Sequence, residues 1–172
     1  QQVSVAAART QARRLVERLG EPLTLADRGA IDGGPPAPQG ASTPPALTHV
    51  FPGPQALAEA DPESFSLPRS RGAALVAMAQ AIASGDVDLE PGADRDATIA
   101  GLLALRGIGP WTASYIAMRA LGDPDAFLPT DLGVIHALRA LGEPTAAAAV
   151  TVRAEVWRPW RSYAVMHLWA TL

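Results

Sequence analysis

Short helix-forming segments, each bounded by glycine or proline, make up most of the sequence and limit the folds open to it. Apolar residues recur at helical spacing from Val5 to Leu19, and Gly20 follows as a natural stop. Comparable segments cover 54–60, 70–84, 94–105, 110–121, 130–141, 145–156 and 159–172. No segment alternates apolar and polar residues as a half-buried strand does. The sequence therefore predicts an all-α protein with short connections.

One connection is long. Residues 26–54 include Gly33-Gly34-Pro35-Pro36 and Thr43-Pro44-Pro45, which continue neither a helix nor a strand. We interpret this tract as a surface loop. The remainder of the 172 residues, of which 48% are hydrophobic overall, suffices for the core of one domain or of two small lobes.

Two residue types are absent from the chain. It has no cysteine, which excludes disulfides, thiolate zinc sites and cysteine-bound iron–sulfur clusters built from its own residues. It also has no lysine, since all 14 basic side chains are arginine, so a lysine Schiff base is excluded. The longest apolar stretches are far shorter than the roughly 20 residues that cross a bilayer, and we expect no membrane contact.

Charge is distributed unevenly. The net charge of −3 argues against non-specific binding to nucleic acid. Residues 1–101 hold 8 arginines and 12 acids, whereas residues 102–172 hold 6 arginines and 5 acids. We therefore expect any contact with a polyanion in the second part.

The most informative segment is 105–113, Leu-Arg-Gly-Ile-Gly-Pro-Trp-Thr-Ala, with a helix-forming segment on each side. Gly107 and Gly109 permit backbone conformations closed to other residues and the close approach of a ligand. Ile108 can anchor the turn in the core. The helix that follows presents unpaired N–H groups that suit a phosphate. Plain connections between helices also use glycine, so this segment alone does not decide the function.

Residues 99–121 resemble a helix-hairpin-helix motif, and Phe-Leu-Pro-Thr-Asp follows at 127–131. This combination resembles the helix-hairpin-helix (HhH-GPD) DNA glycosylase superfamily. Residues 157–164, 167–169, 1–5 and 67–71 are similar to its bacterial 3-methyladenine DNA glycosylase II branch. The resemblance covers nearly all of residues 1–172 except the glycine- and proline-rich tract. It implies a two-lobed helical core, and we expect the β-rich lobe that precedes this core in the branch to be missing here.

The resemblance also implies a function. We expect a monofunctional base-excision repair glycosylase that hydrolyses the N-glycosidic bond of alkylated purines, such as 3-methyladenine and 7-methylguanine, and leaves an abasic site. Its partner would be double-stranded DNA that contains alkylated bases. We expect a monomer in the bacterial cytoplasm.

Asp131 is the expected catalytic residue by its position in the family motif. Pro129 and Thr130 favour a helix start, which places Asp131 in the first turn, where the helix field favours a carboxylate anion. A fixed anion stabilises an oxocarbenium-like state and can orient the attacking water. The alternative is that Asp131 only caps its helix.

In bifunctional members of the superfamily a catalytic lysine follows the hairpin, where this chain has Trp111. We therefore expect no lyase activity on abasic sites. The lack of cysteine excludes the iron–sulfur cluster of some relatives, and we expect no cofactor. In the superfamily a monovalent cation can bind the hairpin carbonyls, so Na⁺ or K⁺ is a candidate ligand of the Gly107 and Gly109 backbone.

By the same resemblance Trp111, Tyr115 and Trp169 line the substrate pocket, where flat aromatic rings attract cationic alkylated purines. Trp111 and Tyr115 are four residues apart and so share one helix face. Leu132 stands at a pocket position where relatives can have an aromatic residue. Ordinary core packing is the alternative for each aromatic residue.

Residues expected to contact DNA include the hairpin and two outlying positions. Gln2 corresponds to the residue that enters the base stack beside the flipped nucleotide. Arg161 is a candidate phosphate contact, as is Arg158, although exposed arginines commonly contact only solvent. The hairpin residues expected to bind DNA are Gly107, Ile108, Gly109 and Thr112.

Two other functions stay open. The chain could be a non-catalytic helix-hairpin-helix module that binds DNA within a larger repair or regulatory protein. Asp131 and the aromatic set argue against this, because a binding module needs neither. A glycosylase for oxidised or mismatched bases is disfavoured by the lack of lysine and cysteine.

Overall fold

The computed structural model describes residues 5–24 and 48–172, and this part of the chain is helical. Its helices are α1 (Val5–Leu19), α3 (Pro54–Ala58), α4 (Arg69–Ser84), α5 (Arg95–Ala104), α6 (Pro110–Arg119), α7 (Leu132–Ala140), α8 (Ala147–Ala154) and α9 (Arg161–Trp169). Two 3₁₀ turns, η1 (Pro62–Ser64) and η2 (Glu155–Trp157), complete the set. The only β structure among the described residues is one isolated bridge, between Pro22 and His49. The predicted all-α class is confirmed.

Helix starts depend on local hydrogen bonds. Asp94 caps α5, because its carboxylate accepts the N–H groups of Asp96 and Ala97 at 3.0 and 3.1 Å. The start of α7 differs from the prediction, which placed Asp131 inside the first turn. Asp131 is itself the N-cap, and its carboxylate accepts the Val134 N–H at 3.0 Å. The helix therefore begins one residue after Asp131.

The segments on either side of the long connection, residues 21–23 and 48–50, are paired by backbone hydrogen bonds. The N–H of Leu23 donates to the carbonyl of Thr48, and the N–H of Val50 donates to the carbonyl of Glu21, each at 2.9 Å. Residues 25–47 lie outside the described part of the chain, and residues 48–53 form no helix. The surface loop predicted for this tract therefore stays a prediction.

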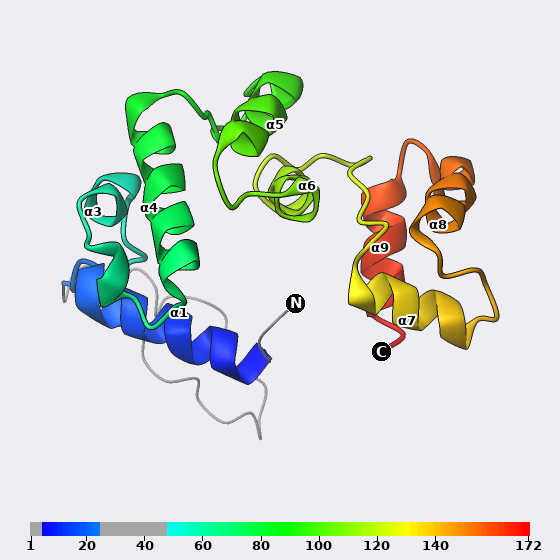
Figure 1. Ribbon diagram of the computed structural model, residues 1–172, viewed down its shortest axis with the longest axis horizontal. Helices are drawn as coiled ribbons and strands as arrows, with labels where there is room; N and C mark the ends of the chain where they lie inside the picture. Colours follow the sequence, from blue (N-terminus) through cyan, green and yellow to red (C-terminus); the bar gives the residue numbers. More distant parts are fainter. Residues whose placement is uncertain (1–4, 25–47) are drawn as a thin grey trace.

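The helices form two groups with a linking pair between them (Figure 1). In the first group α1, α3 and α4 pack around Leu57, Phe65 and Val76. In the second group α7, α8 and α9 enclose fully buried side chains, which include Leu128, Leu138, Val150 and Val165. A third cluster, made of Ala81, Val87, Leu102 and Ala113, joins α4 to α5 and α6. The two lobes are thus connected through the helix-hairpin-helix.

A buried serine fixes the segment that leads from α6 to α7. The Ser162 hydroxyl at the start of α9 lies 2.6 Å from the Asp123 carbonyl and 2.9 Å from the Ala126 carbonyl. Its backbone N–H donates to the Pro124 carbonyl at 2.9 Å. These bonds hold residues 123–126 against α9, and this fixes the path of the chain toward Asp131.

Candidate active site

Asp131 lies at the centre of a hydrogen-bonded group. It is only 6% exposed, and the N–H groups of three residues point at its carboxylate. Oδ1 accepts the backbone N–H of Val134 at 3.0 Å and the indole Nε1–H of Trp169 at 2.8 Å. Oδ2 accepts the indole Nε1–H of Trp111 at 3.1 Å. All are donors, which suits a carboxylate anion, because the ionised group only accepts hydrogen bonds.

The three aromatic residues predicted to line a pocket lie together beside Asp131. Trp111 stacks on Tyr115 with ring centroids 5.2 Å apart and planes 17° apart. Trp169 approaches the other side of the group, 6.2 Å from Tyr115 and tilted by 40°. All three side chains are half-buried. Residues separated by as many as 58 positions in the sequence thus form one aromatic group in contact with one carboxylate.

Leu132 lies outside this aromatic group. It is the first residue of α7 and is 48% exposed. A leucine so exposed at the start of a helix is open to a partner that approaches from solvent. The predicted role of Leu132 as part of the pocket stays a prediction.

The hairpin uses its two glycines differently. Gly107 has φ +95°, and a Cβ there would lie 2.9 Å from the Cβ of Ala74, so both backbone conformation and space favour glycine. Gly109 has φ −104° and ψ 175°, an extended conformation that any residue adopts. Of the two glycines, only Gly107 therefore uses a backbone conformation that is closed to other residues. Nothing lies within 4 Å of the position of its Cβ, which leaves an open approach to the N-terminus of α6.

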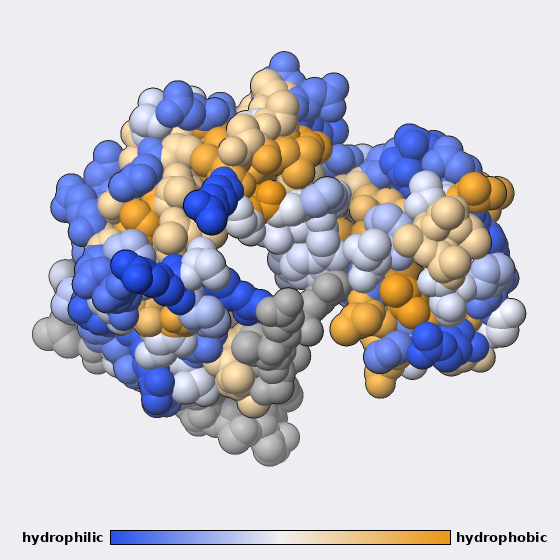
Figure 2. All heavy atoms as spheres, in the orientation of Figure 1, coloured by the Kyte–Doolittle hydropathy of each residue, from blue (hydrophilic) through white to orange (hydrophobic). Residues whose placement is uncertain are grey.

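The remaining hairpin residues line a groove between α4 and α6. Ile108 is half-buried against the cluster that joins α4 to α5 and α6, as expected for an anchor of the turn. A cavity of about 470 Å³ is lined by Arg71, Ala74, Leu75, Met78, Gly107, Ile108, Trp111, Thr112 and Ile116. The surface is visibly hollowed beside these helices (Figure 2). Trp111 therefore belongs both to the groove and to the group around Asp131.

Sequence reasoning missed the α4 side of this groove. Arg71, Leu75 and Met78 face the hairpin from a helix about 30 residues earlier in the sequence. Leu75 and Met78 follow the helical spacing of core residues, so the sequence carries no signal that separates them from the core. Trp160, which directly precedes α9, is 57% exposed and does not pack in the interior.

Arg161 is engaged in an ion pair with Asp125. Its Nε lies 2.7 Å from Asp125 Oδ1 and its second terminal nitrogen lies 2.8 Å from Oδ2, a bidentate contact, and its side chain is only 14% exposed. Arg158 pairs with the same carboxylate at 2.7 Å and with Glu155 at 2.8 Å. This geometry does not favour the predicted phosphate contact of Arg161, because DNA would have to displace Asp125.

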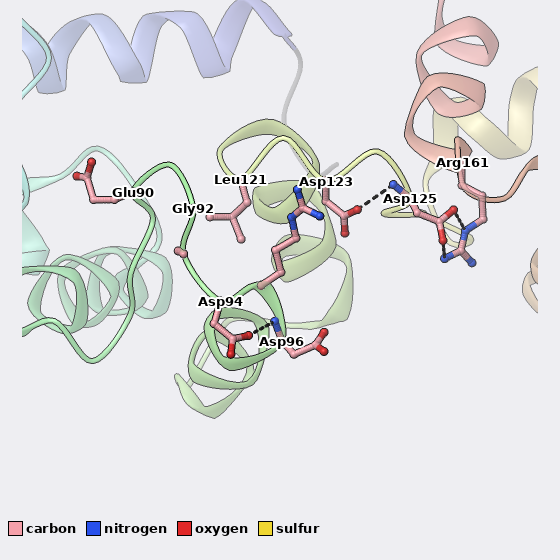
Figure 3. A pocket seen from close by; sticks show the side chains of 10 residues that line it. Glu90, Gly92, Asp94, Asp96, Leu121, Asp123, Asp125 and Arg161 are labelled. Carbon is pink, nitrogen blue, oxygen red and sulfur yellow. Dashed lines mark hydrogen bonds and ion pairs between the residues drawn. The ribbon is translucent and has the colours of Figure 1, made fainter.

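The Asp125 pair also faces an acidic cavity of about 630 Å³ (Figure 3). The hydrogen bond from Arg161 is the main cause that lowers the pKa of Asp125 below its ordinary value. Two further carboxylates of the cavity accept backbone N–H groups: Asp94 caps α5, and Asp123 accepts the Asp125 N–H at 2.8 Å. A cavity of this charge repels phosphate, which argues against a contact with a polyanion here.

We expect Asp125→Asn to destabilise the fold by about 1.5–3 kcal/mol at neutral pH, the range for hydrogen bonds to charged groups. Because folding lowers the pKa of Asp125, its contribution is complete above the ordinary value of 3.8 and is lost as the pH falls through the folded value. The stability of the parent protein should therefore decline more steeply than that of the variant below about pH 5. Thermal unfolding between pH 7 and pH 3 measures both curves.

The matched control is Glu63→Gln, because Glu63 pairs with Arg69 at 3.0 Å while both side chains are largely exposed. An exposed pair contributes about 0–1 kcal/mol. Equal slopes for the parent and Asp125→Asn would contradict a stabilising role for the ionised Asp125.

The contacts described above do not test the predictions about Gln2, a bound ion or a membrane. Gln2 lies outside the described residues. Within residues 5–24 and 48–172 no group of His, Cys, Asp or Glu side chains is arranged to hold a metal ion, and no helix is long and apolar enough to cross a membrane. The Gly109 carbonyl accepts the Ala113 N–H at 3.0 Å, and the cation expected at the hairpin stays a prediction.

Comparison with known proteins gives relatives along the whole chain, although no family model matches it. The chain is 45% identical over all its 172 residues to the "Probable bifunctional transcriptional activator/DNA repair enzyme AlkA" of Mycobacterium tuberculosis, and spans 31% of that protein. It is 36% identical over 124 residues, 70% of its length, to "DNA-3-methyladenine glycosylase 2" of Escherichia coli, and spans 43% of that protein.

Solved structures share the fold. The 3-methyladenine DNA glycosylase of Archaeoglobus fulgidus matches 99% of the chain with a TM-score of 0.75 at 24% identity, over 53% of its own chain. The 3-methyladenine DNA glycosylase of Schizosaccharomyces pombe, in complex with abasic DNA, matches 70% of the chain with a TM-score of 0.60 at 26% identity, over 63% of its own chain. The hairpin, the placement of Asp131 and these relatives agree: the chain belongs to the helix-hairpin-helix DNA glycosylase superfamily, in its 3-methyladenine DNA glycosylase II branch.

Proposed function

We propose that this chain carries the active site of a monofunctional DNA glycosylase that removes alkylated purines, such as 3-methyladenine and 7-methylguanine. The observation that carries the proposal is the buried Asp131 carboxylate, held by two indole N–H groups beside a stacked aromatic pair. The relatives named for 3-methyladenine glycosylase activity support the substrate class. The chain spans only part of the length of those relatives.

The aromatic group provides recognition. A base inside a duplex cannot reach Asp131, so the damaged nucleotide must first be flipped out of the stack. Alkylation at a ring nitrogen makes the purine a cation. Trp111, Tyr115 and Trp169 present half-buried aromatic surface that attracts such a ring by stacking and cation–π contact, worth about 0.5–2 kcal/mol for each residue.

Asp131 provides the catalytic charge. The bond between C1′ and the base nitrogen breaks, and its electron pair neutralises the departing cationic base. Positive charge develops on the sugar, and a fixed carboxylate stabilises it without having to reorient. Water then adds to C1′ and releases its proton to Asp131 or to solvent. Because the base leaves as a neutral molecule, the reaction needs no strong general acid.

The hairpin is the proposed clamp for DNA phosphate. The N-terminus of α6 has Gly109 as its N-cap, and no side chain caps it. The first N–H groups of a helix have no partner within the helix, and they carry the positive end of its dipole. The open space in front of Gly109 lets a phosphate approach, and Thr112 lines the adjoining groove. This contact would use backbone, which suits a chain with net charge −3.

The chemistry should be hydrolysis only. A lyase forms a Schiff base through an amine, and Trp111 occupies the position after the hairpin in a chain without lysine. We propose that the product is an abasic site in an intact strand, that no cofactor takes part, and that the protein acts as a monomer.

The test is release of free base from methylated duplex DNA by the natural protein, identified by chromatography, with strand integrity scored on the same samples. We expect free 3-methyladenine and 7-methylguanine, and strands that break only after treatment with alkali. Strand breaks without alkali, above the spontaneous rate at abasic sites, would contradict hydrolysis as the only chemistry. Binding to DNA with no release of any alkylated base would favour the non-catalytic binding module.

A further inference from the structure

Gly133, two residues after Asp131, has no room for a side chain. A Cβ at this position would lie 2.8 Å from Cδ1 and 2.9 Å from Nε1 of Trp169, and 3.0 Å from Oδ1 of Asp131. The first two distances are shorter than van der Waals contact permits. The atoms that a Cβ would meet are therefore those on either side of the hydrogen bond between Trp169 and Asp131.

Neither partner can move away freely. The indole of Trp169 is a rigid ring that packs against the core of the second lobe and lies 6.2 Å from the ring of Tyr115. Oδ1 of Asp131 is also held by the Val134 N–H at 3.0 Å. Relief of the overlap would thus lengthen the Trp169–Asp131 bond, now 2.8 Å, or turn the carboxylate away from its cap.

Backbone conformation does not explain a glycine here. Gly133 lies inside α7 with a backbone that is not left-handed, and alanine is the better residue in a helix. The close contact with the Trp169 indole explains why glycine stands here in place of a residue with higher helix propensity.

We infer that Gly133 is a positioning residue of the active site, whose lack of a side chain lets Trp169 lie across the first turn of α7 and hold the Asp131 carboxylate. This inference rests on the proposed function for its catalytic consequence. Its structural part, that Gly133 sets the Trp169–Asp131 bond, stands without it.

The structural part is tested by NMR of the indole N–H groups in the natural protein. The chain has four tryptophans, so single Trp→Phe variants assign the Trp169 resonance. We expect Gly133→Ala to move this resonance in the direction it takes in Asp131→Ser, which removes the charged acceptor but keeps a helix cap. An unchanged Trp169 resonance in Gly133→Ala would overturn the inference.

The catalytic part is tested by a double-mutant cycle on single-turnover base release. We expect Gly133→Ala to slow release by about 10- to 100-fold, as a misplaced catalytic group does, with unchanged affinity for DNA. In a Trp169→Leu background the same change should have a much smaller effect, because the indole that it displaces is gone and only the contact of 3.0 Å with Asp131 Oδ1 remains. Effects that multiply in the double variant would overturn the inference.

Gly53→Ala is the matched control. Gly53 has an ordinary φ of −66°, and nothing lies within 4 Å of its Cβ position. We expect parental release and an unmoved Trp169 resonance, and a moved resonance in this control would overturn the assignment to Gly133. If the parent protein releases no base, the proposed function fails, while the NMR result still decides what Gly133 does.

Discussion

Asp131→Asn should slow the release of alkylated base by about 10³-fold or more, since it removes the charge that stabilises the developing cation. The amide has nearly the shape of the carboxylate, and its oxygen can still accept from Val134 and Trp169. Its NH₂ group would then face the Trp111 indole, now 3.1 Å from Oδ2, and two donors repel each other. The hairpin is not altered, so binding to DNA should persist.

Single-turnover release on methylated duplex DNA measures the first effect, and a mobility-shift titration measures the second. Asp125→Asn is the matched control, because it makes the same chemical change in a carboxylate that pairs with Arg161 and not with the aromatic group. It should retain release at a temperature where it stays folded. Release by Asp131→Asn within tenfold of the parent would contradict a catalytic Asp131.

Trp111→Phe should slow release by about 10- to 100-fold, less than the roughly 10²- to 10³-fold cost of removing a donor that contacts the reacting atoms themselves, because the lost N–H acts through Asp131. Phenylalanine keeps a ring that can stack on Tyr115, whose centroid is 5.2 Å away, but it lacks the N–H that holds Oδ2 of Asp131. The substitution therefore separates the hydrogen bond from the aromatic wall. Trp111→Ala, which removes both, should have the larger effect.

The measurements are the rate constant of release and the dependence of rate on substrate concentration. Trp160→Phe is the control, because Trp160 is largely exposed and pairs only with the exposed Tyr163 among the ring contacts of the described residues. If Trp111→Phe matches the parent while Trp111→Ala does not, Trp111 acts through its ring alone and the indole bond to Asp131 has no catalytic weight.

The helices could be predicted from the sequence because their limits are set locally. Gly85 ends α4, Pro110 begins α6 and Asp94 caps α5, each through backbone geometry or a hydrogen bond within three residues. The start of α7 shows the limit of this reasoning. Both Thr130 and Asp131 are residues that cap helices, and only the bond to Val134 decides between them.

The residues of the candidate site could be predicted from the sequence, but the hydrogen bonds between them could not. The family motif pointed to Asp131, Trp111, Tyr115 and Trp169, and the structure brings them together. That both indoles donate to the same carboxylate depends on how α6, α7 and α9 pack, which no local pattern encodes. Asp131 caps α7 and also lies beside the aromatic group, so its capping bond does not conflict with the proposed catalytic role.

Arg161 and Gly109 show why the rest could not be predicted. The partner of Arg161 lies 36 residues earlier in the sequence, so the sequence cannot distinguish a paired arginine from one that is free to bind phosphate. For Gly109, the sequence cannot distinguish a glycine that is needed for its backbone conformation from one that keeps the space beside it open. The structure shows an extended backbone, which any residue adopts, and open space at the position of the Cβ.

The rate of release of free alkylated purine from methylated duplex DNA, with the protein in excess, decides whether the Asp131 carboxylate catalyses base removal. Release is compared with spontaneous loss from the same DNA and with Asp131→Asn. We predict first-order release far above the spontaneous rate, an intact strand that carries the abasic site, and a rate for Asp131→Asn close to the spontaneous one. Tight binding of the DNA with release at the spontaneous rate would show that the protein binds DNA but does not catalyse base removal.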